Sequence, residues 1–297
     1  FKLVTGISTG ALIAPYAFLG SDFDDELERI FTSITNKDIY RIRSPFAIIK
    51  KDSLALTDPL ARKIEEVITA EILEAIATEH RRGRRLFVGT ANLDAQRFVI
   101  WNLGAIAASD HPDALNLFRR VLLASSSIPV AFPPVYIKVK TPDGRTYDEM
   151  HVDGGASSQM FFYPVQFDFR EVRERLDVKG TPTIYLVRNA FLDPAYRTTS
   201  PRLLPIAGRT IDSLIRTQGL GDFFRIATLA ERDGLDFEVT WIPKGTNELI
   251  GVTPTEEFDP RYMKALFEYG QQRTLEGETW ANFFQLLDAE EGRRASP

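Results

Sequence analysis

The feature that most constrains the fold of this chain is the pentapeptide Gly-Ile-Ser-Thr-Gly at residues 6–10, which follows a short apolar run and precedes a helix-like stretch. A serine at a sharp turn between a strand and a helix is pushed above the sheet, and glycines on either side let neighbouring backbone pass close. The N–H of the next residue can then face an oxyanion that develops on a bound carbonyl group. The motif therefore predicts a nucleophilic Ser8, with Gly6 and Gly10 shaping the turn and Thr9 offering its N–H. An ordinary serine in a tight turn would show the same five residues.

A serine nucleophile needs a base to remove its proton, and the chain has only three histidines. His80 lies in an arginine-rich helix end and His111 precedes a proline in a polar loop, so both are predicted to be surface residues. In the α/β-hydrolase order of serine, acid and histidine, only His151 lies late enough in the chain to serve. An α/β-hydrolase-type esterase that uses His151 therefore stays open as an alternative.

Asp153 is the better candidate for the base. An alternation of apolar and polar residues ends there and is followed by Gly154 and Gly155, which is typical of a strand that delivers a carboxylate to a turn. The two glycines leave room for another backbone or a bulky substrate, and they allow a positive φ at the turn. A plain Asp-Gly-Gly surface turn has the same sequence, so the interpretation of Asp153 as a base depends on Ser8.

Together with a third motif, these two resemble the motifs of the patatin-like phospholipases. Ser8 lies in that family's G-x-S-x-G motif and Asp153 in its D-G-G/A motif. Between them, residues 124–134, Ala-Ser-Ser-Ser-Ile-Pro-Val-Ala-Phe-Pro-Pro, match the family's A-S-x-x-x-P-x-x-F-P-P block. The resemblance covers roughly the first half of the chain, to Pro164. The serines at positions 125–127 are expected to be turn and packing residues beside the site.

The resemblance implies a lipid acyl hydrolase, a phospholipase A or another carboxylic ester hydrolase, that works by a dyad of Ser8 and Asp153. Ser8 would attack an ester carbonyl to form an acyl-enzyme, and Asp153 would take the serine proton, pass it to the leaving alcohol and then activate water. An ordinary aspartate, with a pKa of ~3.9, is a weak base, so this mechanism requires burial that raises the pKa of Asp153. Lipid acyl esters are the implied substrates, and no metal or organic cofactor is required. A general carboxylesterase or an acyltransferase also fits the motifs.

One segment of the family pattern is not among these residues. In the family a glycine-rich turn and a helix come before the nucleophile strand, and that turn supplies most N–H groups of the oxyanion hole. The chain begins at Phe1, already on the nucleophile strand, so we expect the upstream strand and helix to be missing from residues 1–297. A non-catalytic lipid-binding or scaffold protein that keeps the fold with an incomplete oxyanion hole is therefore a further alternative.

Strands that alternate with helices predict an α/β fold, and the resemblance implies a three-layer α/β/α sandwich with a largely parallel central sheet and a hairpin before Asp153. Length and composition fit one domain over residues 1–297, because 44% of the residues are hydrophobic and 26% are charged. The expected strands are residues 84–90, 97–101, 135–140, 145–152, 183–188 and 237–242, and the expected helices are residues 24–32, 60–79, 115–124, 206–232 and 260–287.

Composition also limits partners and location. A net charge of −5 gives no general attraction to nucleic acid or to anionic membrane, so no nucleic-acid partner is expected and any membrane contact should be local and peripheral. The chain has no cysteine, which excludes disulfides, thiolate metal sites and the disulfide-rich calcium-dependent phospholipases. The longest apolar stretch, residues 11–19, is too short to span a membrane and contains Pro15. These features predict a soluble domain and leave its compartment, cytoplasm or cell envelope, open.

Two other segments have two interpretations each. The basic run at residues 81–85 either binds lipid phosphate or complements the dipole at a helix end, and the second is favoured. The aromatic run at residues 161–163 either lines an acyl pocket or belongs to the core.

Overall fold

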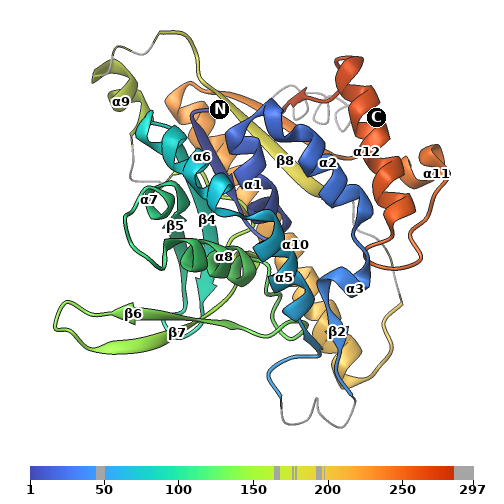
Figure 1. Cartoon of the computed structure of the whole chain (residues 1–297). Coiled ribbons are helices and arrows are strands. Elements are labelled where there is room, and N and C mark those ends of the chain that lie inside the picture. Colours follow the sequence, from blue (N-terminus) through green and yellow to red (C-terminus); the bar gives the residue numbers. More distant parts are fainter. Residues whose placement is uncertain are drawn as a thin grey trace. The chain divides into compact units, whose positions relative to one another are not determined.

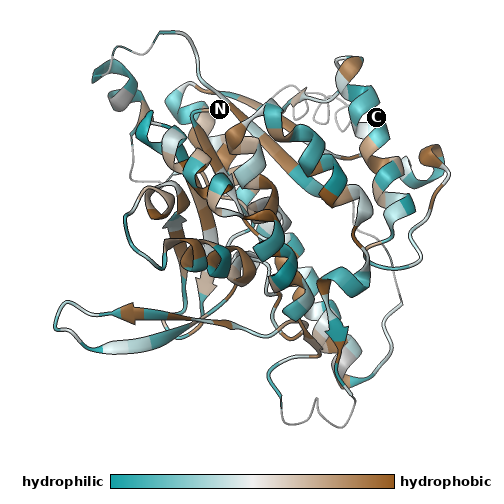
Figure 2. Ribbon diagram, in the orientation of Figure 1, coloured by the Kyte–Doolittle hydropathy of each residue, from teal (hydrophilic) through white to brown (hydrophobic). Residues whose placement is uncertain are grey.

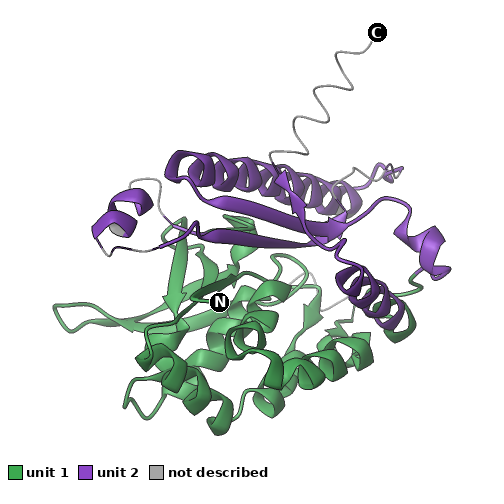
Figure 3. Ribbon diagram, turned by 90° about the horizontal axis from the view of Figure 1, so that it is seen from above, with its two compact units in different colours: residues 1–161, 254–263 green, residues 162–253, 264–297 purple. Residues whose placement is uncertain are grey.

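The computed structural model describes residues 1–44, 51–163, 168–175, 177, 179–191, 196 and 198–283. The chain forms two compact units, coloured separately in Figure 3: unit 1 is Phe1–Phe161 with Pro254–Met263, and unit 2 is Phe162–Thr253 with Lys264–Pro297. The α/β class expected from the sequence is confirmed, with strands and helices that alternate along the chain (Figure 1). One domain over residues 1–297 stays a prediction.

The main sheet of unit 1 has five strands, in the order β1-β4-β7-β6 with β5 also paired to β4. β1 and β4 are parallel, whereas β4–β5, β4–β7 and β6–β7 are antiparallel. A parallel pair is confirmed at β1–β4, and the hairpin expected before Asp153 is confirmed as β6–β7, since a tight hairpin joins antiparallel strands. The strands of unit 1 are β1 Leu3–Gly6, β2 Arg41–Ile42, β3 Ala55–Leu56, β4 Arg85–Asn92, β5 Arg97–Asn102, β6 Val135–Lys140 and β7 Thr146–Asp153.

The helices of unit 1 bury one apolar core against this sheet. α1, α7 and α8 contact β4, and the largest fully buried apolar side chains of the unit come from these helices, from the α5–α6 region and from β4. Figure 2 shows mainly apolar residues along α8 and mainly polar residues on α2. The helices are α1 Thr9–Leu19, α2 Asp24–Ser33, α3 Asn36–Ile39, α5 Asp58–Val67, α6 Ala70–Arg81, α7 Leu103–Ala107 and α8 Ala114–Ser125, with short 3-10 turns η1 Ser21–Phe23 and η2 Gly154–Ala156.

The helix expected over residues 60–79 is in fact two helices, α5 and α6. The chain leaves helical geometry at Ile68, and the Thr69 hydroxyl accepts the Ile72 N–H at 3.4 Å as the N-cap of α6. Because threonine stabilises the start of a helix through such a bond, the apolar stripe continues while the axis is interrupted.

Unit 2 has a smaller sheet in which β8 and β9 are parallel and β10 is antiparallel to β9. The long helix α10 joins β8 to β9, as a parallel pair requires. Phe223 of α10 packs against Phe237 of β9 and against Phe283, with ring centroids 5.6 Å and 4.4 Å apart. The remaining elements are β8 Thr183–Phe191, β9 Asp236–Ile242, β10 Ala281–Asn282, α9 Phe169–Arg175, α10 Leu203–Asp233, α11 Thr246–Ile250 and α12 Pro260–Leu275.

The helix expected over residues 260–287 is shorter than predicted. α12 ends at Leu275, and Gly277 has a φ of 77°, a left-handed conformation that a continuing helix cannot contain. Residues 281–282 then form β10, and the rest of the expected helix, residues 284–287, lies outside the described residues. Within the described ranges, none of the helices has the length and apolar character that a membrane crossing needs.

We expect Leu122→Ala to destabilise unit 1 by about 2–5 kcal/mol, because this side chain of α8 is 1% exposed and its loss leaves a cavity. Leu93→Ala is the matched control: its side chain is 44% exposed, so the free energy of unfolding should change by less than about 0.5 kcal/mol. Urea unfolding of both variants measures the difference. Equal effects would show that α8 does not belong to the core.

Candidate active site

Ser8 lies at a strained turn between β1 and α1. Its backbone has φ 56° and ψ −127°, a conformation that costs a residue with a side chain about 1–3 kcal/mol. The turn is closed on one side by the Gly10 N–H, which donates to Ile7 O at 2.9 Å. Although Ser8 is the N-cap of α1, its hydroxyl makes no capping bond, and the residue is half-buried. The side chain is therefore presented at the turn instead of being used by the helix.

The two glycines of the first motif have different surroundings. A Cβ on Gly6 would lie 2.3 Å from the carbonyl oxygen of Gly10, so only glycine fits there. A Cβ on Gly10 would meet no atom within 4 Å among the described residues. The close backbone approach expected at both glycines is thus confirmed for Gly6 alone, and the space beside Gly10 is open.

The backbone N–H groups around Ser8 are used unequally. Those of Ser8, Gly10 and Ala11 donate to Ser125 Oγ, Ile7 O and Ser8 O respectively. Thr9 begins α1, where the N–H groups have no acceptor within the helix and the helix dipole favours negative charge. Its role as an oxyanion donor stays a prediction.

Asp153 ends β7 and is 4% exposed. Its backbone N–H donates to Ser127 O at 2.8 Å, and its Oδ1 accepts the Gly155 N–H at 2.7 Å. Burial raises the pKa of Asp153 to about 6, although hydrogen bonds from the Ser8 side chain and the Gly155 N–H act in the opposite direction. The carboxylate therefore has the raised pKa that a general base needs, and it contacts the Ser8 side chain.

Gly154 is required by space, and Gly155 has little room for a side chain. A Cβ on Gly154 would lie 2.6 Å from Gly89 O, and one on Gly155 would lie 3.0 Å from Asp153 Oδ1. Neither glycine has a positive φ, so the left-handed turn that the sequence allowed is not formed. The absence of side chains lets the turn after β7 pack directly on β4.

β4 brings the two motifs together. β1 pairs with its first half, ending with Gly6 opposite Val88, and β7 pairs with its second half, ending with Asp153 opposite Thr90. Gly89 lies between the two registers. The carboxyl-terminal ends of β1 and β7 therefore meet beside Gly89. Asp153 is the last residue of β7, and Ser8 lies two residues after the end of β1.

The three serines at residues 125–127, where α8 ends, make more contacts with the site than expected. Ser125 Oγ accepts the Ser8 N–H at 3.1 Å and donates to Gly89 O at 2.7 Å. Ser126 and Ser127 donate their hydroxyls to Leu122 O and Leu123 O, one helical turn back. The expectation of turn and packing residues holds for these two, but Ser125 contacts the nucleophile turn itself. In the sequence, only the family motif indicated that Ser125 lies near the site, because no local pattern links residue 125 to residue 8.

An apolar surface adjoins the meeting point. A Cβ on Gly89 would lie 2.2 Å from the Phe98 ring, which packs against Phe161 with ring centroids 5.2 Å apart. Ile7, 8% exposed, contacts the same region. The aromatic run was predicted either to line an acyl pocket or to belong to the core. The contact of Phe161 with Phe98 is compatible with both, because it is an apolar packing contact that lies beside Ser8 and Asp153.

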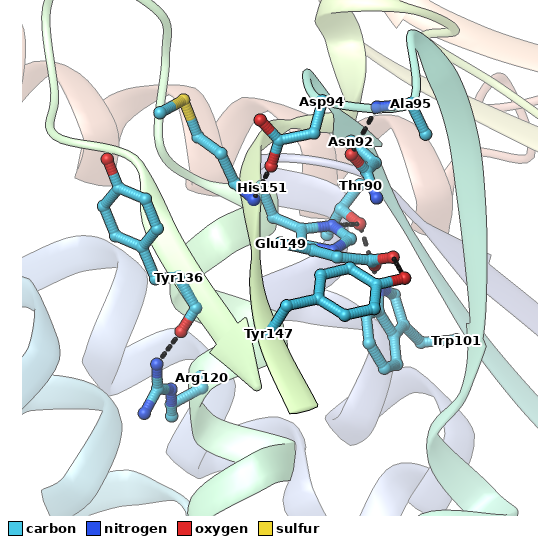
Figure 4. Close-up of polar contacts among 11 residues, drawn as sticks. Thr90, Asn92, Asp94, Ala95, Trp101, Arg120, Tyr136, Tyr147, Glu149 and His151 are labelled. Atoms are coloured by element: carbon cyan, nitrogen blue, oxygen red, sulfur yellow. Dashed lines mark hydrogen bonds and ion pairs between the residues drawn. The ribbon is translucent and has the colours of Figure 1, made fainter. Parts of the chain in front are cut away.

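His151 is not available to Ser8. It is fully buried, with Nδ1 2.9 Å from Thr90 Oγ1 and Nε2 3.2 Å from Glu149 Oε2, as Figure 4 shows. A carboxylate only accepts, so Nε2 carries the proton and Nδ1 accepts from the Thr90 hydroxyl, which itself accepts the Trp101 indole N–H. Burial lowers the pKa of His151, and Glu149 offsets this only in part. Both ring nitrogens are thus occupied, which weighs against the α/β-hydrolase alternative.

The other histidines and the basic run lie away from this chemistry. His111 is exposed and its Nδ1 accepts the Asp113 N–H, as a surface residue would. His80 is less solvated than expected, because its Nδ1 is buried beside Gly104. Three arginines of the basic run form ion pairs with acidic residues of α6: Arg81 with Glu74, and Arg82 and Arg84 with Glu79. Arg85 donates to the carbonyl groups of His80 and Arg84 at the helix end.

A family model described as patatin-like phospholipase matches residues 1–165, more than half of the chain and the part that contains all three motifs. No curated protein matches the chain.

We expect Asp153→Asn to gain stability relative to the unchanged protein as the pH rises. Below about pH 4 the carboxyl is neutral in the folded and unfolded states, whereas above its folded pKa of about 6 the folded state must bury a charge. Two pKa units correspond to about 3 kcal/mol, which the amide should recover between pH 4 and pH 8. Urea unfolding at each pH measures this, with the solvent-exposed Asp148→Asn on the same strand as control. A constant difference would mean that Asp153 is not desolvated.

Proposed function

This chain belongs to the patatin-like phospholipase family, whose members are lipid acyl hydrolases, and we propose that it hydrolyses carboxylic esters of lipids through Ser8 and Asp153. The observation that carries the proposal is the buried Asp153 carboxylate beside the Ser8 side chain, with its pKa raised by burial to about 6. An aspartate in this state is a much better base than an exposed one and is still mostly ionised at neutral pH.

The first half of the reaction forms the acyl-enzyme. As Ser8 Oγ attacks the ester carbonyl carbon, its proton passes to Asp153, and the carbonyl oxygen becomes an oxyanion beside the Thr9 N–H and the positive end of α1. When the tetrahedral intermediate collapses, the bond to the leaving alcohol breaks and the alcohol takes the proton from Asp153. The acyl group is left on Ser8.

The second half releases the acid. Asp153 removes a proton from water, whose oxygen attacks the acyl carbon, and the second intermediate returns the proton to Ser8 Oγ as the carboxylic acid leaves. Both halves need one base in two protonation states, which a group with a pKa of about 6 can reach near neutral pH. The apolar side chains of Ile7, Phe98 and Phe161 support an acyl chain as the bound part of the substrate.

Labelling with a fluorophosphonate tests the nucleophile. We expect one adduct, on Ser8, because among the serines that the structure describes only this one combines a strained turn, a base and a helix N-terminus. Ser8→Ala should abolish the adduct, while Ser33→Ala, which removes an exposed hydroxyl that donates to Arg29 O, should leave it unchanged. Mass spectrometry of the digested protein locates the label. Labelling of Ser8→Ala at the same rate as the unchanged protein would contradict the proposal.

The pH dependence of hydrolysis tests the base. We expect kcat/KM to rise about tenfold per pH unit below pH 6 and to level off above it, since Asp153 must be ionised to accept the serine proton. Asp153→Asn should lose turnover of short-chain and phospholipid esters with the fold intact. A histidine would titrate in the same range, so His151→Gln is the deciding control: it should lower the melting temperature but keep the acid limb. Loss of that limb in folded His151→Gln would support the α/β-hydrolase alternative instead.

A further inference from the structure

The three consecutive serines at the end of α8 make different contacts. Ser126 and Ser127 donate their hydroxyls to carbonyl groups four residues back, at 3.0 Å and 2.9 Å, which any serine near a helix end can do. The Ser125 hydroxyl leaves its helix and reaches two other elements, the turn at Ser8 and strand β4 at Gly89. One residue of the block is thus distinguished from its two neighbours by its partners.

The two bonds of Ser125 fix its hydroxyl in one orientation. A hydroxyl has one proton and two lone pairs, and the proton is used by Gly89 O, so a lone pair faces the Ser8 N–H. Ser125 is 0% exposed, so water cannot replace the bond if the hydroxyl is removed. The hydroxyl therefore joins the end of α8, β4 and the turn that carries Ser8.

The same helix end also holds the base. The carbonyl group of Ser127 accepts the Asp153 N–H at 2.8 Å, two residues after the contact to Ser8. The turn at Ser8 and the end of β7 are thus attached to one short segment, through a side chain in the first case and through backbone in the second. A rigid segment between two attachment points sets the distance between them.

We propose that Ser125 is a positioning residue for the nucleophile, which holds the strained turn so that Ser8 Oγ stays in contact with Asp153. The inference rests on the proposed function, because it assigns Ser125 a role in that reaction. Without the hydrogen bond to Ser125 Oγ, the Ser8 N–H is unpaired, and one of the contacts that hold Ser8 at its φ of 56° is lost. The turn then relaxes, and the Ser8 side chain moves away from the Asp153 carboxylate. A displacement of about 1 Å in a catalytic group lowers the rate on the order of 100-fold.

The adjacent serines supply matched controls. Ser126→Ala removes a hydroxyl from the same helix end without touching the turn, and Ser127→Ala removes a hydroxyl but keeps the carbonyl group that holds Asp153. The three alanine variants and the unchanged protein are compared in ester hydrolysis and in the rate of fluorophosphonate labelling of Ser8. The labelled fraction at completion counts the folded sites, and thermal melting monitors the fold.

We expect Ser125→Ala to reduce kcat and the labelling rate per folded site by about 10–100-fold with KM changed by less than about threefold, since binding of the acyl chain does not involve this hydroxyl. Ser126→Ala should stay within about threefold of the unchanged protein, and Ser127→Ala should lose less rate than Ser125→Ala, because it keeps the carbonyl group that accepts the Asp153 N–H. If Ser125→Ala does not fold, Ser125→Cys replaces it, because the thiol is a weaker polar group of similar shape. Its loss of kcat should be smaller than the loss of about 10–100-fold expected for alanine, but larger than that of Ser126→Ala.

Two outcomes overturn the inference and are distinct from failure of the proposed function. If Ser125→Ala loses labelled fraction but keeps its rate per folded site, the residue is only structural. If all three alanine variants lose rate equally, the helix end has no specific role for Ser125. Loss of the proposed function appears separately, as labelling and hydrolysis that survive in Ser8→Ala.

Discussion

The structure depends on one strand, β4, which pairs with β1 along its first half and with β7 along its second half. β1 runs parallel to β4 as far as Val88 and β7 runs antiparallel to it from Thr90, so both chains must turn away at Gly89. Side chains would prevent this. Gly6 packs on the backbone of Gly10, Gly154 packs on the carbonyl group of Gly89, and each would clash with a Cβ at less than 3 Å. The close packing at Gly6 and Gly154 thus brings a serine and a carboxylate from residues 8 and 153 together beside Gly89.

That contact is costly for the fold, and the surrounding helices offset it. The strained backbone of Ser8 and the desolvated Asp153 each destabilise the folded state by an amount on the order of a few kcal/mol. α8 stabilises the same region, because Phe118, Val121 and Leu122 are at most 1% exposed and pack into the core of unit 1. Since the hydroxyl and carbonyl groups that touch the turn and β7 lie at the end of this buried helix, core packing is transmitted directly to the site. Strain held in this way is common where a protein needs one precise geometry.

A second polar network lies close in sequence but serves another purpose. Trp101, Thr90 and His151 form a chain of hydrogen bonds that continues through Glu149 to the Tyr147 hydroxyl and links β5, β4 and β7 (Figure 4). Each member is paired, so the buried polar atoms stabilise the strand pairing instead of destabilising it. The network braces the strand that ends at Asp153. This explains how a buried histidine lies two residues from the carboxylate without taking part in the proposed proton transfer.

The sequence alone determined the local parts of this protein: the turn after β1, the hairpin of β6 and β7, the acid that follows it and most strands and helices, because each depends on residues that are adjacent in the chain. It placed Ser8 and Asp153 as candidates through motif and alternation. It did not determine that β7 pairs antiparallel with β4, that Thr69 divides a helix, or that Gly154 is needed for space and not for a positive φ. Those outcomes arise from partners far apart in sequence. The raised pKa of Asp153 comes from burial, and Ser125 reaches Ser8 across 117 residues. Only tertiary packing brings such groups within the few ångströms over which hydrogen bonds and desolvation act.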